Sequence, residues 1–372
     1  MTLPPESGSD DVVFLFKRGR RERLEAGGDW PSEFFYGYVE MKNTGAPVDL
    51  LDEAAFGIGA RTAPVWTALT IISSALFGLN AWAIHRLSKG LGRLSQAREV
   101  VVVNNAYGLA LAYHKARGRL PGGVVFIAMG LVGAAPPLLL RWVYGRILRH
   151  VTVAVISRAE REHLAALFSD IKVHYVPFGV DHRFWTPGEG QDKGDYVLSV
   201  GNDKNRDFHT LIRAWRPEFS TLRIVTQRAV PATLPANVEV IAGDWRAQVL
   251  SDGELRDMVR GSRFVVVPSR DTMQPAGQSA CLQAMACGKA VVLSDIAGLW
   301  DRGLMRHGEN CILVKPGDAG ALGRAVQGLL DDPEVARDIG QAARRTVEDH
   351  LNVDVMARAV RALCFENQAN AV

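Results

Sequence analysis

Short apolar runs rich in β-branched residues alternate along the chain with segments whose apolar residues recur at helical spacing. Continuous apolar runs are typical of parallel strands that helices cover on both faces. The expected strands of a first sheet lie at 12–16, 100–103, 124–127 and 152–156, and those of a second at 196–200, 222–226, 238–241, 264–267, 290–293 and 311–314. This rhythm, repeated twice, predicts an α/β fold with two Rossmann-like, doubly wound domains.

A polar stretch with several prolines and glycines separates the two halves. It runs from Pro177 to Asp195 and includes Pro187 and Gly188. Such residues favour turns and linkers. We therefore expect a first domain at 1–180, a linker at 181–195 and a second domain at 196–350. A last helical segment, 351–372, is expected to pack back toward the first domain.

The formal net charge of +3 is unevenly distributed. Between Ala54 and His150, eleven Lys and Arg residues accompany a single acid, Glu99. A surface of one sign attracts anions such as lipid phosphates or nucleic acid. Two uncharged stretches, 62–84 and 120–140, are long enough to span a bilayer, but prolines and glycines interrupt both. We expect buried core there rather than membrane spans, with contact with an acidic membrane surface as an intermediate alternative.

The cysteines and the N-terminus indicate a compartment. The four cysteines lack the spacing of a zinc site or a disulfide framework, which favours a reducing environment. The first residues lack the basic-then-apolar pattern of a signal peptide. We therefore expect a cytoplasmic protein, peripheral on the inner face of the membrane if its basic region contacts lipid.

One strand–loop–helix segment could hold a diphosphate. After the expected strand at 264–267, a polar loop leads to a helix that opens near Gly277. Its first turn carries Ala276, Gln278 and Ser279, and no large side chain there shields the backbone. A phosphate can therefore approach unpaired backbone N–H groups and the positive end of the helix dipole. A tight turn that only packs would explain a single glycine at a helix start equally well.

A second loop carries positive charge. Gly201 ends the strand at 196–200, and Lys204 and Arg206 follow before a helix that begins near Phe208. Ligands of open α/β sheets bind beyond the carboxyl ends of strands, and fixed cations can stabilise a departing diphosphate. Two solvated loop bases are the alternative. Arg206 is the stronger candidate because it lies just before the helix.

Together these segments resemble the donor-binding domain of the GT-B glycosyltransferases usually grouped as family 4. Three segments carry the resemblance: 176–181 (VPFGVD) is similar to the family's interdomain junction, 199–201 with Arg206 to its phosphate loop, and 283–289 (QAMACGK) to its signature helix. The match covers roughly residues 151 to the C-terminus. It implies transfer from a nucleotide-sugar with retention of configuration and without a metal, between two domains that face a cleft.

The sequence departs from that family at two glutamates eight positions apart. The resemblance places Gln283 where one glutamate grips the ribose, and Pro275 where the other touches the donor sugar. Gln283 can still hydrogen-bond to hydroxyls, without charge assistance. Asn202 replaces the family's arginine, so Lys204 and Arg206 are expected to supply the charge as catalytic residues. The donor-binding candidates are Gly201, Asn202, Gln274, Pro275, Ala276, Gly277, Gln278, Ser279 and Gln283.

The first half offers candidates for the acceptor side, because polar groups there follow expected strands. A solvated charge run is the alternative for the basic group. No catalytic base is assigned, since 128–130 (AMG) stands where family members often carry a histidine. The acceptor-side candidates are Lys17, Arg18, Gly19, Asn104 and Asn105.

Several motifs of other enzyme classes are absent from the sequence. It contains no Asp-x-Asp triplet, no NTPase phosphate loop, no Gly-x-Ser-x-Gly elbow and no dinucleotide fingerprint. We expect no metal and no cofactor, with a UDP- or GDP-linked sugar as co-substrate, a sugar or lipid-linked acceptor, and no nucleic acid. The expected role is polysaccharide or glycolipid synthesis. Two alternatives stay open: a weakened GT-B protein that only binds a nucleotide or sugar, and a phosphorylase or nucleotide-sugar epimerase of the same fold.

Overall fold

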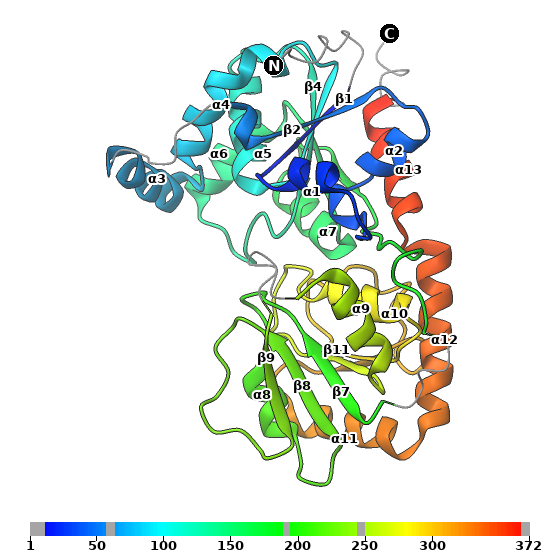
Figure 1. Cartoon of the computed structure of the whole chain (residues 1–372). Coiled ribbons are helices and arrows are strands. Elements are labelled where there is room, and N and C mark those ends of the chain that lie inside the picture. The colour runs from blue at the N-terminus through cyan, green and yellow to red at the C-terminus, as the bar shows by residue number, and fades with distance from the viewer. Residues whose placement is uncertain (1–11, 57–63, 189–193, 244–249, 366–372) are drawn as a thin grey trace. The chain divides into compact units, whose positions relative to one another are not determined.

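The computed structural model describes residues 12–56, 64–188, 194–243 and 250–365, and the chain divides into two compact units (Figure 1). Unit 1 contains residues 1–28, 35–176 and 356–372, and unit 2 contains residues 29–34 and 177–355. The main division follows Val176, at the start of the stretch rich in proline and glycine. Residues 29–34, from the first half of the sequence, cluster with unit 2. The expected linker and last segment lie partly outside the described residues.

Each unit is built on a six-stranded sheet in which all pairings are parallel. The strands of unit 1, in the order β2-β1-β3-β4-β5-β6, are β1 (Val12–Phe16), β2 (Val48–Asp52), β3 (Glu99–Val102), β4 (Gly123–Ala128), β5 (Thr152–Val155) and β6 (Val173–Tyr175). Those of unit 2, in the order β12-β11-β10-β7-β8-β9, are β7 (Tyr196–Val200), β8 (Thr221–Thr226), β9 (Val238–Ala242), β10 (Val265–Val267), β11 (Val291–Ser294) and β12 (Ile312–Val314). The predicted pair of doubly wound α/β domains is confirmed.

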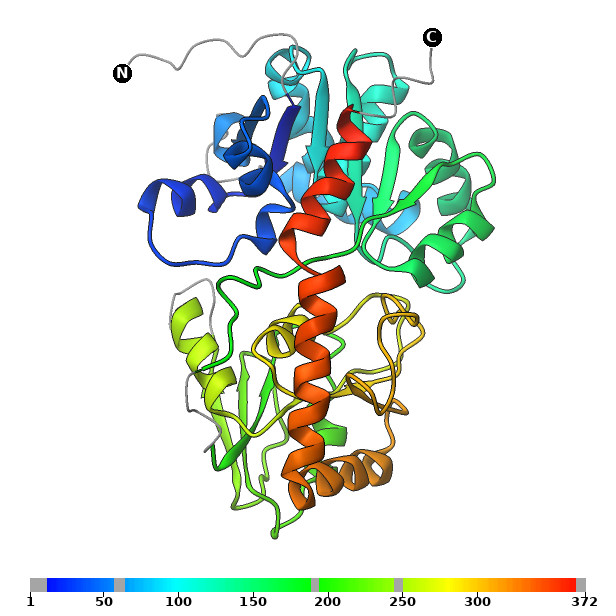
Figure 2. The same ribbon diagram turned by 90° about the vertical axis from the view of Figure 1, so that its right-hand side faces the viewer.

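Helices flank both sheets (Figures 1 and 2). In unit 1 these are α1 (Arg20–Ala26), α2 (Tyr38–Asn43), α3 (Pro64–Phe77), α4 (Ala81–Leu94), α5 (Asn105–Ala116), α6 (Leu138–Leu148) and α7 (Arg158–Leu167). A short 3-10 turn at Glu53–Phe56 also belongs to unit 1, and another at Glu33–Phe35 lies where the chain passes from unit 2 back to unit 1. In unit 2 they are α8 (Phe208–Ala214), α9 (Asp252–Gly261), α10 (Gln278–Ala286), α11 (Ala319–Asp331) and α12 (Pro333–His350). Helix α13 (Val353–Phe365) begins in unit 2 and passes into unit 1.

The strand order of each sheet reverses at one point. In unit 2 the chain proceeds outward from β7 through β8 to β9, and then returns to β10 on the other side of β7. The loops that follow β7 and β10 therefore leave the same edge of the sheet in opposite directions. In unit 1 the same reversal occurs between β1 and β3. Open α/β sheets bind their ligands at such points.

Two edge strands do not appear in the sequence pattern. Strand β2 begins with a half-buried and an exposed residue, and all three residues of β6 are only half-buried. Both lie at the borders of the unit 1 sheet. An edge strand is covered on fewer sides than a central one, so it needs no continuous apolar run.

The sequence of residues 32–43 has a helix-like pattern, but the structure interrupts the helix within it. Tyr36 and Gly37 have φ values of 50° and 89°, which separate the 3-10 turn from α2. An added Cβ at Gly37 would lie 2.8 Å from the Cα of Ala357 in α13. The close approach of α13 and the left-handed backbone explain why the helix stops here.

The expectation of buried core at 62–84 is wrong for α3. Residues 62 and 63 lie outside the described residues, and α3 exposes Leu69, Ile71 and Ile72. The stretch 120–140 contains buried β4, but then reaches the exposed start of α6. No single described helix is long and apolar enough to span a bilayer. The pair 66–77 and 81–94, which together reach that length and composition, is bent by 108°.

Packing of α5 on β4 leads to a stability prediction. An added Cβ at Gly108 would lie 2.1 Å from the ring of buried Phe126, whereas one at Gly92 in α4 would meet nothing within 4 Å. Gly108→Ala should therefore lower the free energy of unfolding by about 1–3 kcal/mol through overpacking. Gly92→Ala, the matched control, should raise it by about 0.5–1 kcal/mol through helix propensity. Urea unfolding of both variants checks the prediction, and equal effects would contradict it.

Candidate donor site

Two loops at the carboxyl edge of the unit 2 sheet are joined through their backbones. Arg206 and Ser269 form an antiparallel bridge. The N–H of Asp207 donates to the carbonyl oxygen of Pro268 at 3.1 Å, and that of Arg270 to the carbonyl oxygen of Asn205 at 2.8 Å. These loops follow β7 and β10, where the strand order reverses. The two segments that the sequence singles out for phosphate binding are thus neighbours.

Arg206 is buried between these loops and is only partly paired. Its side chain is 6% exposed, and Nη2 donates to the carbonyl oxygen of Val200 at 2.7 Å. Nε and Nη1 are buried without a hydrogen-bond partner among the described residues. Burial lowers the pKa of Arg206 to about 10, so the side chain is still a cation at neutral pH. A buried cation with two unused donors forms a strong site for an anion.

Two glycines let this guanidinium lie against both backbone segments. Gly201 and Gly277 have φ values of 152° and 85°. An added Cβ would lie 2.2 Å from Arg206 Nε at the first position and 2.8 Å from Nη1 at the second. Any side chain at either position would displace the guanidinium. The glycines therefore place the charge where a phosphate could also reach the backbone.

Helix α10 opens at the same place. Its N-cap, Gly277, provides no capping side chain, and the first backbone N–H to bond back to it is that of Cys281. The N–H groups of Ser279 and Ala280 therefore have no acceptor within the helix. These donors and the helix dipole add to the charge of Arg206. The ensemble suits a phosphate or diphosphate group.

Two other predicted donor residues, Gln274 and Ala276, help to hold the loop after β10 in place. Asn205 Nδ2 donates to Gln274 Oε1 at 2.9 Å, and Gly298 packs so closely that an added Cβ would lie 2.4 Å from the carbonyl oxygen of Met273. Ala276 is buried, and its N–H donates to the carbonyl oxygen of Gln274 at 2.7 Å. Pro275, whose ring offers no donor, precedes it.

Asn202 and Lys204 differ in their surroundings from Arg206. Asn202 Nδ2 donates to the carbonyl oxygen of Gly243 at 2.7 Å, and Oδ1 accepts from the N–H of Gln227 at 2.6 Å. Its amide therefore fastens the ends of β8 and β9. Lys204 is exposed on the loop. A catalytic role for Lys204 stays a prediction, and Arg206 is the base that lies against α10.

Gln283, in the middle of α10, binds a carboxylate from far away in the sequence. Gln283 Nε2 donates to Glu33 Oε1 at 3.0 Å, and Trp185 Nε1 donates to the same oxygen at 2.9 Å. The backbone N–H of Asp181 donates to Glu33 Oε2 at 3.2 Å. All four residues belong to unit 2, because Glu33 lies in its segment 29–34. With Nε2 occupied, the carbonyl end of Gln283 is left to accept a hydrogen bond from a ligand hydroxyl.

Glu33 is not among the residues that the sequence analysis singles out. Its side chain is fully buried, and burial raises its pKa to about 7, although the three donors favour the charged form. Ser32 reinforces the attachment, since its N–H and Oγ both donate to Asp181 Oδ2, at 3.2 and 3.1 Å. A contact between positions 33 and 283 has no local sequence signal, so only the structure identifies it.

The acceptor-side candidates lie at the point of reversal in the unit 1 sheet. Lys17, Arg18 and Gly19 follow β1 and are exposed. Asn104 caps α5 by accepting from the N–H of Tyr107 at 3.2 Å. Asn105 exchanges two hydrogen bonds with the backbone of Met129, at 2.9 and 3.2 Å, which fastens the end of β4. Contact with an acceptor stays a prediction. Within the described residues, no three His, Cys, Asp or Glu side chains are grouped to bind a metal ion.

Comparison with known sequences points to one family. The model of the family described as "Glycosyl transferases group 1" matches residues 194–332. The chain is 26% identical over 212 residues to an alpha-maltose-1-phosphate synthase of Mycolicibacterium smegmatis, covering 48% of this chain and 53% of that protein. It is 26% identical over 226 residues to an MMP alpha-(1->4)-mannosyltransferase of Mycolicibacterium hassiacum, covering 56% and 54%. The chain thus spans about half the length of the curated relatives it matches.

Solved structures share the fold over almost the whole chain. A sucrose-phosphate synthase from Thermosynechococcus elongatus superposes with a TM-score of 0.73 at 20% identity, covering 98% of this chain and 100% of that one. Anabaena HepE, in complex with UDP-glucose, superposes with a TM-score of 0.66 at 14% identity, covering 95% and 99%. At these identities the likeness shows a common two-domain GT-B architecture.

The two unpaired nitrogens of Arg206 lead to a binding prediction. Arg206→Met keeps the volume and removes two charged donors, each worth about 1.5–3 kcal/mol, so affinity for UDP should fall by about 100-fold or more. The free energy of unfolding should change by no more than about 1–2 kcal/mol, because only one hydrogen bond is lost and a desolvated charge disappears with it. Calorimetric titration with UDP checks the first effect. Arg213→Met, at an exposed position of α8, is the matched control, and equal affinities of the two variants would reject the assignment.

The buried carboxyl of Glu33 predicts a pH dependence of stability. Its pKa is raised from 4.5 to about 7, so its contribution is complete below the unfolded value and is lost as the pH rises through the folded one. Glu33→Gln cannot titrate. Between about pH 5 and pH 8, wild type should therefore lose about 1–3 kcal/mol of unfolding free energy relative to the variant.

Urea unfolding across that pH range provides the measurement. Glu162→Gln, at an exposed position on α7, is the control and should differ from wild type by a constant amount. A constant difference for Glu33→Gln as well would show that burial does not control the titration of Glu33.

Proposed function

Since this chain belongs to the group 1 glycosyltransferases of the GT-B fold, we propose that it transfers a sugar from a nucleotide-sugar donor to an acceptor. One observation carries the proposal: the buried cation of Arg206 lies against the uncapped start of α10 with two nitrogens unpaired. This combination of charge and directed donors matches a diphosphate. Transfer releases that diphosphate as the leaving group, and donors that face it stabilise the charge it acquires.

The donor nucleoside would lie beyond the diphosphate, toward Gln283. Its carbonyl end can accept from a ribose hydroxyl because Glu33 holds the amide nitrogen. UDP is the first candidate, since HepE, which shares this fold, was solved in complex with UDP-glucose. A GDP-linked sugar is the second. In this proposal, Glu33 replaces in part the charge that the family's glutamate would carry at position 283.

The reaction would proceed with retention and without a metal ion. The names of the two relatives described above include an alpha configuration, and UDP-glucose carries its sugar in α linkage, so transfer from such a donor to an alpha product would retain configuration. Arg206, the N–H groups of α10 and the exposed Lys204 are the groups proposed to neutralise the diphosphate. The acceptor is proposed to be a sugar or a lipid-linked glycan, in polysaccharide or glycolipid synthesis.

A second function, binding of a nucleotide or sugar without transfer, is favoured by one specific observation. Pro275 and Gln283 occupy the positions at which the resemblance to family 4 places glutamates. Pro275 cannot hydrogen-bond to a donor sugar through its side chain. A protein with an intact diphosphate site and an incomplete sugar site would bind donor and leave it unreacted.

Nucleotide release separates these functions. Purified chain is incubated with UDP-glucose, GDP-mannose or ADP-glucose, and free nucleoside diphosphate is measured over time. Slow release from one donor is expected, about 100-fold slower in Arg206→Met and unchanged by EDTA. Loss of release with EDTA would contradict metal independence. Tight calorimetric binding without release, with and without candidate glycan acceptors, would favour the binding function.

A further inference from the structure

Helix α3 is apolar on the side where a soluble helix is normally polar. Its exposed side chains include Ile71 at 65%, Ile72 at 54% and Leu76 at 52%. Two of its hydroxyl groups, those of Thr70 and Ser73, bond to α4 or to the turn that leads to it. Thr70 Oγ1 accepts from the N–H of Trp82 at 3.1 Å, and Ser73 Oγ donates to the carbonyl oxygen of Leu79 at 2.7 Å. No described side chain of α3 is buried, so this helix adds little to the core.

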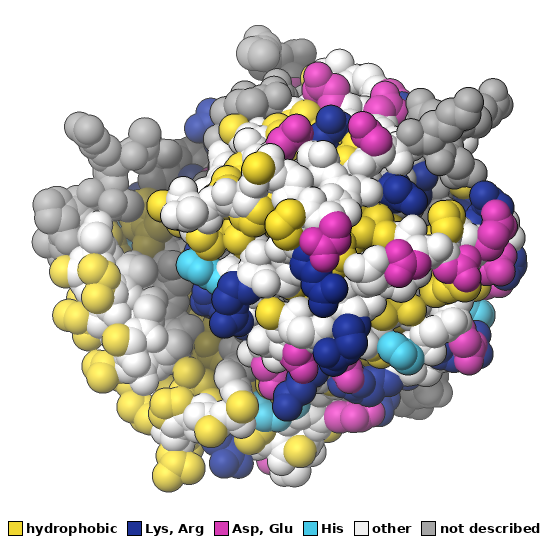
Figure 3. Space-filling view, turned by 90° about the horizontal axis from the view of Figure 1, so that it is seen from below, with side chains coloured by type: hydrophobic (Ala, Val, Ile, Leu, Met, Phe, Trp, Pro, Cys, Tyr) yellow, Lys and Arg dark blue, Asp and Glu magenta, His cyan; other side chains and the backbone are white. Residues whose placement is uncertain are grey.

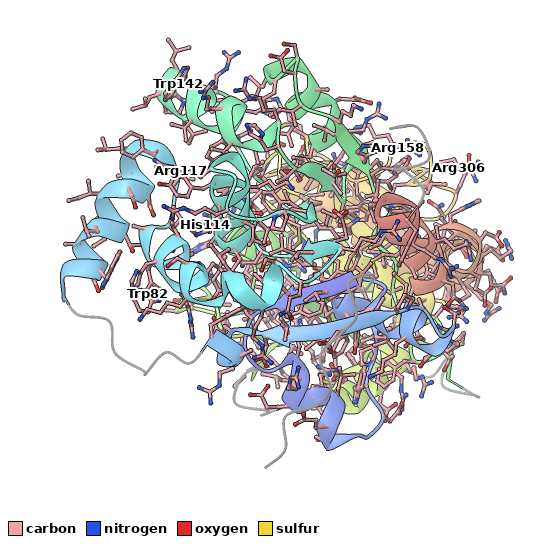
Figure 4. All side chains as sticks on the ribbon, turned by 90° about the horizontal axis from the view of Figure 1, so that it is seen from above. Trp82, His114, Arg117, Trp142, Arg158 and Arg306 are labelled. Atoms are coloured by element: carbon pink, nitrogen blue, oxygen red, sulfur yellow. The ribbon has the colours of Figure 1, made fainter. Side chains whose placement is uncertain are left out.

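Helix α6 continues the apolar surface. Tyr144 donates to the carbonyl oxygen of Gly78, just after α3, at 3.1 Å, and this contact joins the two helices. On α6, Leu138 is 79% exposed and Trp142 is 68% exposed. Figure 4 shows Trp142 pointing away from the ribbon. We call this surface the α3–α6 face; its members are Leu69, Ile71, Ile72, Leu76, Phe77, Leu138, Leu139 and Trp142.

The α3–α6 face is exceptional within this molecule. Among the described residues, the other large hydrophobic side chains that are well exposed are Val240 and Val335, on separate elements of unit 2. Figure 3 shows hydrophobic side chains gathered on the left of the view, the side on which Figure 1 draws α3. Contiguous exposed apolar surface of this kind marks an interaction site.

The charges around the face determine the chemistry of the partner. In the described residues from 64 to 150 the only acid is Glu99, which is 5% exposed. Exposed bases lie on α6 and on the neighbouring helices. They are Lys89 and Arg93 on α4, Arg117 and Arg119 after α5, and Arg146 and Arg149 on or just after α6. An apolar face whose own helices carry exposed bases and no acid is complementary to an anionic lipid surface.

The dimensions favour a helix that lies on the bilayer rather than one that crosses it. Helix α3 has 14 residues, whereas a span requires about 20. Trp142 is exposed at the end of the face, and tryptophan is typical of the membrane–water interface. Trp66 stacks on His85 of α4 at 4.1 Å, which holds α3 against the fold while its outer side stays free.

We propose that the α3–α6 face docks unit 1 on an anionic lipid bilayer. In this arrangement the leucine, isoleucine and tryptophan side chains enter the interface, and Arg146 and Arg149 contact lipid phosphates. The docking would bring an enzyme of glycan assembly to a membrane-bound acceptor. The surface itself is independent of the donor site in unit 2.

Sedimentation with vesicles tests the docking. The full chain is mixed with vesicles of equal parts phosphatidylcholine and phosphatidylglycerol at low salt, and the pelleted fraction is measured. Wild type should pellet. Ile71→Glu/Trp142→Glu should bind about tenfold more weakly or worse, because burial of one such side chain alone is worth about that factor.

Two further variants make the test specific. Val240→Glu/Val335→Glu places the same charge at two exposed apolar positions of unit 2, on β9 and α12, and should bind like wild type. Arg146→Gln/Arg149→Gln should weaken binding to the anionic vesicles more than to vesicles of phosphatidylcholine alone. Circular dichroism and thermal unfolding of each variant confirm that it is folded, without reference to donor binding.

Three outcomes would overturn the proposal, and a fourth would reject only the proposed enzyme activity. Wild type that stays in the supernatant with anionic vesicles excludes docking, as does an Ile71→Glu/Trp142→Glu variant that pellets like wild type. Dimerisation that is lost in this variant, without vesicle binding by wild type, would assign the face to a second copy of the chain. Failure of nucleotide release with vesicle binding intact would reject the enzyme and leave the docking surface.

Discussion

The proposed donor site depends on a cation that the fold buries without giving it a full set of partners. Arg206 is 6% exposed, donates once to the backbone of β7, and keeps two nitrogens unpaired. Leaving charged donors unsatisfied in the interior is costly, and a protein retains such a group where a ligand supplies the missing acceptors. The surrounding features follow from this requirement. Gly201 and Gly277 make room for the guanidinium, and the uncapped start of α10 adds backbone donors.

A second constraint comes from the short segment 29–34. Although it precedes most of unit 1, it clusters with unit 2, where the Glu33 carboxylate accepts from Gln283 and Trp185. Helix α10, which is proposed to bind the donor, is thereby held through Gln283 by the carboxyl group of a residue 250 positions away in the sequence. The Glu33 carboxyl thus lies one hydrogen bond behind Gln283, the position at which the resemblance to family 4 places a glutamate.

The sequence predicts the architecture well and the donor loops in part. Continuous apolar runs identify the central strands, because these are buried on both faces, and the strand order then brings the loops after β7 and β10 together. The edge strands β2 and β6 are not predicted, because their partly exposed residues do not form a continuous apolar run. The contact of Glu33 with Gln283 is not predicted either, because the two residues are distant in the sequence. Helix α3 is misjudged because composition alone does not tell whether an apolar helix faces a core, a lipid or water.

The donor diphosphate is proposed to bind between Arg206 and the start of α10. A crystal structure of the chain with UDP bound tests it most directly. Phosphate oxygens within hydrogen-bond distance of Arg206 Nε or Nη1 and of the backbone N–H groups of Ser279 or Ala280 are the predicted result. A diphosphate bound elsewhere, with the Arg206 guanidinium still unpaired, would contradict it.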